Sequence, residues 1–122
     1  RSPVLQREWI PPAAHLNAVG ADAPGKQELD PRILQDAVVV VDDVEQAIHS
    51  GEVNVPIRNG QYSPGRIAAH LGEVICGRKP GRSRPEEITV FDSTGLAIQD
   101  IAAARFVYDE CRRTGHGVRM RF

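Results

Sequence analysis

The chain has 122 residues, enough for one domain or for a piece of a larger one. Its hydrophobic share of 41%, charged share of 25% and formal net charge of -1 are those of an ordinary folded protein. Because it has no block of like charges and no long apolar run, the sequence argues against a nucleic-acid or membrane partner.

The cysteines and histidines follow no metal-ligand or redox spacing. Cys76 and Cys111 lie far apart in the chain, and no histidine stands near either of them in a ligand pattern. We therefore expect two free thiols in a reducing cytoplasm and no metal site.

The first half of the chain predicts two strands with a helix between them. Residues 16–20 predict a short strand, and Asp30 followed by Pro31 is typical of a helix N-terminus. The continuous β-branched run at residues 37–41 predicts a strand that is buried on both faces, as in a parallel sheet.

The middle of the chain predicts two further helices. Over residues 43–51, Asp43 and Gln46 have the form of a capping box. Residues 63–76 predict the next helix, because a Ser-Pro start is followed by apolar residues at helical spacing. We expect the stretch between these helices to be irregular, with a tight Asn-Gly turn at residues 59–60.

The last predicted elements are a strand over residues 88–91 and a long helix from Ala97 to Gly115. Strands that alternate with helices indicate an α/β fold with a mainly parallel sheet. No Gly-rich dinucleotide-binding turn is present, and three strands would leave an open edge. Both points favour a fragment of a larger domain.

Two loops at the carboxyl ends of strands could carry chemistry. In residues 20–26, Asp22 could act as a general base and Lys26 could bind an anionic or carboxamide group. The alternative there is a turn with an exposed ion pair. In residues 92–95, hydroxyls and free backbone N–H groups could receive a ligand oxygen, or could simply cap the last helix. Asp42 is expected to end a strand, although an acid in such a loop can touch a ribose.

Four stretches in order resemble the ornithine cyclodeaminase and mu-crystallin family. They are residues 15–30, 40–47, 71–77 and 88–100, and the resemblance covers nearly the whole chain. Thr94 and Leu96 depart from the cyclodeaminase pattern and are similar to the archaeal alanine dehydrogenase branch of the family.

The resemblance implies a fold and a domain arrangement. Residues 1–98 would be the second half of a Rossmann-type NAD(P)-binding domain, and residues 99–122 a C-terminal helix and tail. That helix would return to an N-terminal substrate and dimerisation domain that is absent from this sequence. The parent protein would be a homodimer, and this fragment alone would be inactive.

The resemblance also implies an activity and a site. The parent would oxidise L-alanine to pyruvate and ammonia through an imine, with NAD as cofactor and NADP left open. One alternative is conversion of L-ornithine to L-proline and ammonia, and another is a non-catalytic NAD(P)H- or small-ligand-binding protein of the mu-crystallin type. Asp22 would be catalytic and Thr94 would touch the amino-acid substrate. The cofactor contacts would be Ala18, Val19, Gly20, Ala21, Lys26 and Ser93.

Overall fold

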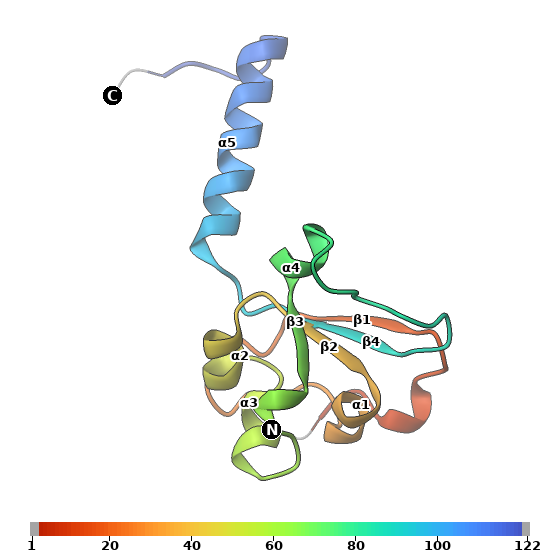
Figure 1. Ribbon diagram of the computed structural model, residues 1–122. Coiled ribbons are helices and arrows are strands. Elements are labelled where there is room, and N and C mark those ends of the chain that lie inside the picture. The colour runs from red at the N-terminus through yellow and green to blue at the C-terminus, as the bar shows by residue number, and fades with distance from the viewer. Residues whose placement is uncertain (1–2, 121–122) are drawn as a thin grey trace.

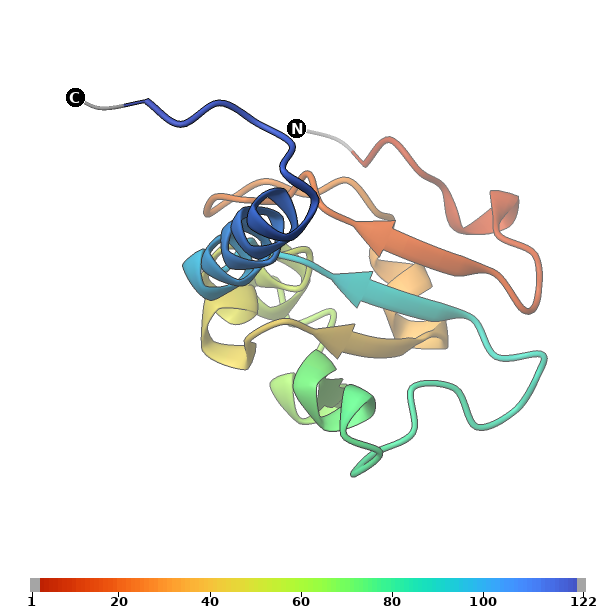
Figure 2. The same cartoon turned by 90° about the horizontal axis from the view of Figure 1, so that it is seen from above.

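The computed structural model, which describes residues 3–120, contains one sheet of four parallel strands. The strands are β1 (His15–Ala18), β2 (Val38–Val41), β3 (Ile67–His70) and β4 (Thr89–Asp92), in the spatial order β1-β4-β2-β3. Every pairing is parallel, which confirms the predicted α/β class. The arrowheads of β1, β4 and β2 point to the same edge (Figure 2), so the loops that follow them share that edge.

Helices lie on both sides of the sheet. In Figure 1, α1 (Pro31–Asp36), α2 (Val44–Ser50) and α3 (Asn54–Arg58) lie below it, whereas α4 (Leu71–Ile75) and α5 (Ala97–Thr114) rise above it. Two short 3-10 turns, η1 (Arg7–Trp9) and η2 (Pro64–Arg66), complete the elements.

The hydrophobic core lies between the sheet and α1 to α3. The most deeply buried apolar side chains are Ile33, Leu34, Val39, Val41, Val53 and Val90. On the other side of the sheet is a hollow of about 700 Å³, whose lining includes His15, Asn17, Val40, Leu71, Val74 and Phe91. The interior is therefore built on one face of the sheet.

The predicted caps explain where α1 and α2 begin. The Asp30 carboxylate accepts the backbone N–H of Arg32 at 2.9 Å, and the Asp43 carboxylate accepts that of Gln46 at 2.8 Å. The capping-box prediction is wrong in its second half, because the Gln46 amide donates instead to the Gly95 carbonyl at 3.1 Å. The start of α2 is thereby attached to the loop that follows β4.

Loss of the Asp43 cap should destabilise the chain measurably. Asp43→Ala leaves a backbone N–H at the start of α2 without its partner, at a cost of about 1 kcal/mol in the free energy of unfolding. Urea unfolding followed by circular dichroism measures this cost. Glu45→Ala, an exposed change in the same helical turn, should cost only a few tenths of a kcal/mol. Equal losses in the two variants would contradict the assignment of the cap.

The helix predicted over residues 63–76 is wrong over half its length. Residues 67–70 form β3, which pairs with β2, and only Leu71–Ile75 are helical. Apolar spacing alone cannot separate a short edge strand from a helix, and pairing with the buried β2 decides the outcome here. The sheet therefore has four strands rather than three.

A second difference lies in the stretch that was predicted to be irregular. Residues 54–58 form α3, and the tight turn predicted at residues 59–60 follows it. The interior Pro56 masked this helix in the sequence. Because it is the third helical residue, its missing N–H would have had no partner within the helix.

The long α5 confirms the last predicted element. Gly115 ends it with φ of +73°, a left-handed conformation that glycine adopts without strain. No residue of α5 is buried, and its exposed apolar side chains are Ile98, Ile101, Phe106, Val107 and Tyr108. The helix projects away from the sheet (Figure 1). Within residues 3–120, no helix combines the length and the apolar character needed to cross a membrane.

Candidate functional site

Three loops meet at the carboxyl edge of the sheet. They follow β1, β2 and β4, and direct hydrogen bonds join them. The backbone N–H of Ser93 donates to the Ala18 carbonyl at 2.9 Å, and that of Asp42 donates to the Asp92 carbonyl at 3.3 Å. In open α/β sheets this edge is where ligands bind. The structure thus brings the two loops that the sequence singled out to one place.

Asp22 and Lys26 form an ion pair at the surface of the loop after β1. Their side chains are 59% and 43% exposed, so both can reach a ligand. The hydrogen bond from Lys26 holds the pKa of Asp22 below its ordinary value of 3.8. The exposed ion pair of the alternative interpretation is therefore present, and it keeps an accessible carboxylate in its proton-accepting form.

The residues just before Asp22 alternate between buried and exposed. Ala18 and Ala21 are buried, whereas Val19 and Gly20 are exposed at the edge of the sheet. The N–H of Gly20 donates to the Glu28 carboxylate at 3.1 Å. A Cβ at position 20 would collide with that carboxylate, so a larger residue there would require the Glu28 side chain to shift. The loop after β1 therefore exposes the Val19 side chain and the Gly20 backbone at the edge of the sheet.

Thr94 is held by Asp42, the buried acid at the end of β2. The Asp42 carboxylate accepts the N–H of Thr94 at 2.8 Å, its hydroxyl at 2.8 Å, and the N–H of Gly95 at 3.0 Å. These N–H groups are therefore not free, and the prediction that they receive a ligand oxygen is wrong. The capping alternative is wrong too, because the N-cap of α5 is Leu96, with no side-chain cap.

Two buried acids lie near this edge: Glu52, which the sequence did not indicate, and Asp92, whose loop the sequence indicated but whose burial it did not. Glu52 and Asp92 have no exposed surface. Burial raises the pKa of Glu52 to about 7 and that of Asp92 to about 6. Within residues 3–120 neither carboxylate has a salt-bridge partner, and Asp92 Oδ1 has no hydrogen-bond partner. No local signal could have shown their burial, since their partners lie more than twenty residues away in the chain.

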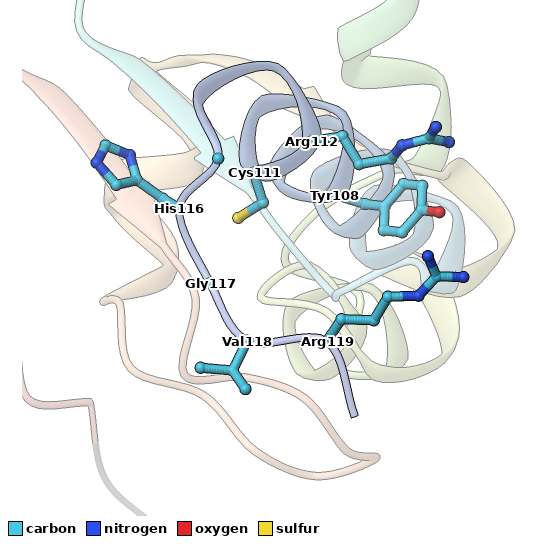
Figure 3. Close-up of a pocket in the computed structure, with 8 residues that line it drawn as sticks. Tyr108, Cys111, Arg112, His116, Gly117, Val118 and Arg119 are labelled. Atoms are coloured by element: carbon cyan, nitrogen blue, oxygen red, sulfur yellow. The ribbon is translucent and has the colours of Figure 1, made fainter. Parts of the chain in front are cut away.

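A separate pocket of about 570 Å³ lies at the far end of α5, where the C-terminal tail passes the helix (Figure 3). Tyr108, Cys111 and Arg112 of the helix face His116 to Arg119 of the tail. None of the three loops at the sheet edge contributes to it. Within residues 3–120, no group of three or more His, Cys, Asp or Glu side chains could hold a metal ion.

Comparisons with known proteins agree with this fold. Alanine dehydrogenase of Archaeoglobus fulgidus is 52% identical over 122 residues, which is 100% of this chain and 38% of that protein. A solved archaeal alanine dehydrogenase dimer with bound NAD has a TM-score of 0.88 at 51% identity, over 99% of this chain and 38% of that one. Thermococcus litoralis Δ1-pyrroline-2-carboxylate reductase, solved with NADH and L-proline, has a TM-score of 0.87 at 35% identity, over 97% and 37%.

This chain thus spans less than two fifths of the length of these relatives. The sequence profile of the ornithine cyclodeaminase/mu-crystallin family matches residues 1–115. This match confirms the resemblance drawn from the four sequence motifs, and the chain belongs to the ornithine cyclodeaminase/mu-crystallin family.

Proposed function

We propose that this chain is the C-terminal part of an NAD-dependent enzyme that oxidises L-alanine to pyruvate and ammonia. One observation carries the proposal. The ionised and accessible Asp22 lies with Lys26 at the carboxyl edge of a parallel sheet, in a chain 52% identical to an alanine dehydrogenase. An acid that stays ionised at this edge is suited to accept a proton from a reacting ligand.

The edge fits the nicotinamide end of NAD. Val19 and Gly20 are exposed beside Asp22, so a flat ring can approach without meeting a large side chain at position 20. The 122 residues contain no Gly-rich phosphate-binding turn, and the proposal assigns the pyrophosphate to residues outside this chain. When bound, NAD supplies the hydride acceptor. The cofactor contacts that we propose are Ala18, Val19, Gly20, Ala21, Lys26 and Ser93.

Asp22 provides the acid-base chemistry in this proposal. Once the α-carbon has lost its hydride, water adds to the resulting imine carbon and Asp22 accepts a proton from that water. Asp22 passes this proton to the nitrogen of the carbinolamine and then accepts the proton of its hydroxyl, so that ammonia leaves and the carbonyl of pyruvate forms; Asp22 releases its proton to solvent. Lys26 holds the Asp22 carboxylate at this edge through the ion pair. Thr94, fixed by Asp42, faces the amino-acid substrate.

The domain arrangement is part of the same proposal. Residues 1–98 would form the second half of the NAD-binding domain, and residues 99–122, of which 121–122 lie outside the described part, would return to a separate substrate and dimerisation domain. The exposed apolar side chains along α5 suit such packing. In this proposal the full-length protein is a homodimer, and it works in a reducing cytoplasm.

The test uses the full-length protein that contains this chain, with NAD and either L-alanine or L-ornithine, and follows NADH and ammonia together. We expect NADH and ammonia to accumulate in equal amounts with L-alanine. Ammonia and proline from L-ornithine without net NADH would indicate a cyclodeaminase, because the hydride is returned to the product. If the protein binds the cofactor but forms neither set of products, both enzymatic activities are contradicted. The result would then favour a non-catalytic binding protein.

A further inference from the structure

The segment between α2 and α3 lies beneath the loop that carries Asp22. Its residues are Gly51, Glu52, Val53 and Asn54, and all four are buried. They contact the loop after β1 on one side and the end of β4 on the other, through side-chain-to-backbone hydrogen bonds. We call residues 51–54 the bracket segment.

Glu52 closes the base of the Asp22 loop. Its carboxylate accepts the N–H of Leu29 at 2.9 Å and also that of Glu28. The Glu28 carboxylate in turn accepts the N–H of Gly20 at 3.1 Å. The two ends of residues 20–28 are therefore joined by the half-buried Glu28 side chain, and the buried Glu52 holds the Glu28 end of this loop, in which Asp22 lies.

Asn54 holds the tip of the same loop. Its Oδ1 accepts the N–H of Gly25 at 3.0 Å, and its Nδ2 donates to the Lys26 carbonyl at 3.1 Å. Gly25 has a φ of +83°, a conformation that fits glycine and that this pair of bonds fixes. Asn54 thus holds the backbone of Lys26, the residue whose side chain pairs with Asp22.

Asp92 sets the bracket segment against β4. Its Oδ2 accepts the N–H of Val53 at 3.3 Å, directly before Ser93 and Thr94 in the chain. A Cβ at Gly51 would lie 2.6 Å from Asp92 Oδ2 and 2.8 Å from the Ala47 Cα. Only glycine allows this close approach. The bracket segment thus contacts both the Asp22 loop and the end of β4, and it fixes the position of one relative to the other.

This arrangement is a costly way to stabilise a loop. A buried carboxylate without a cation destabilises the folded state, and an apolar side chain of similar size would often serve stability better. The Glu52 carboxylate accepts two backbone N–H groups at once, which favours a fixed loop position. We propose that Glu52 and Asn54 are positioning residues that fix Asp22 and Lys26 against the reacting atoms, a role that rests on the function proposed above for Asp22.

The kinetic test compares variants of the full-length enzyme. Glu52→Ala and Asn54→Ala should each lower kcat by on the order of 100-fold, because a misplacement near 1 Å has an effect of that size. The Kd for NAD should change far less. Glu52→Gln keeps an oxygen that can accept both N–H groups, and it should recover most of the lost kcat. Ile57→Ala, a partly buried change in α3 that contacts the core rather than the loop, is the matched control and should keep kcat.

Amide hydrogen exchange on the full-length protein that contains this chain gives a second measurement that does not depend on activity. Glu52→Ala should speed exchange at Glu28 and Leu29, and Asn54→Ala should speed it at Gly25, while Ile57→Ala leaves these amides as they were. Unchanged exchange overturns the proposal whatever the enzyme does. Faster exchange with a kcat equal to that of Ile57→Ala also overturns it, and the function of Asp22 then stands by its own test.

Discussion

Asp22→Asn in the full-length protein that contains this chain should lower kcat for L-alanine oxidation by on the order of 100-fold or more, the usual effect of removing a general base. An amide has nearly the shape of the carboxylate but does not accept a proton at neutral pH. Because the Asp22 side chain is 59% exposed, the substitution should leave the fold intact. The Kd for NAD should stay nearly constant, so the loss should appear in turnover. Steady-state kinetics with an independent binding titration separates these two quantities.

The chain offers a close control for this substitution. Asp109 in α5 forms a surface ion pair with Arg105 four residues away, and its side chain is 51% exposed. Asp22 has the same kind of partner at the same spacing. Asp109→Asn should therefore remove a similar ion pair and leave kcat unchanged. If the two variants had the same activity, Asp22 would be an ordinary surface acid, and the proposed mechanism would lose its proton acceptor.

Local signals in the sequence were enough to predict most of the fold. The valine run of β2 and the caps at Asp30 and Asp43 depend on residues within a few positions of one another. Signals of this kind predict the same local structure in any fold that buries the valine run. β3 could not be found in this way, because residues 67–70 have a helical apolar spacing and become a strand only by pairing with β2.

The interior of the candidate site lay beyond prediction for the same reason. Asp42 and Thr94 are 52 positions apart, and Glu52 and Leu29 are 23 apart. A single sequence carries no sign that these groups meet. Gln46 shows how a local interpretation can fail, since its amide has the right spacing for a capping box and yet bonds to Gly95, 49 positions away. The roles of Asp22, Ser93 and Thr94 came from the family resemblance, and they stay predictions until the kinetics are measured.

The buried acids should make the folded chain more stable in mild acid than in mild base. Burial raises the pKa of Glu52 from 4.5 to about 7 and that of Asp92 from 3.8 to about 6. Between these limits the folded state holds protons that the unfolded state releases. The free energy of unfolding must then fall as pH rises. Acids with lowered pKa, such as Glu87, act in the opposite direction, but only below about pH 4.5.

The expected loss is on the order of 2–4 kcal/mol between about pH 5 and about pH 8, since one unit of pKa corresponds to about 1.4 kcal/mol. Urea unfolding of the 122-residue chain at the two pH values measures it. Glu52→Gln should remove the share that comes from Glu52, and the difference between this variant and the unmodified chain isolates that share from all other groups. Glu87→Gln is the control and should leave the slope between these pH values unchanged. A chain that gained stability from pH 5 to pH 8, with the same slope in Glu52→Gln, would show that Glu52 is ionised at both pH values. Glu52 would then be held by the backbone N–H groups of Glu28 and Leu29 strongly enough to offset its burial.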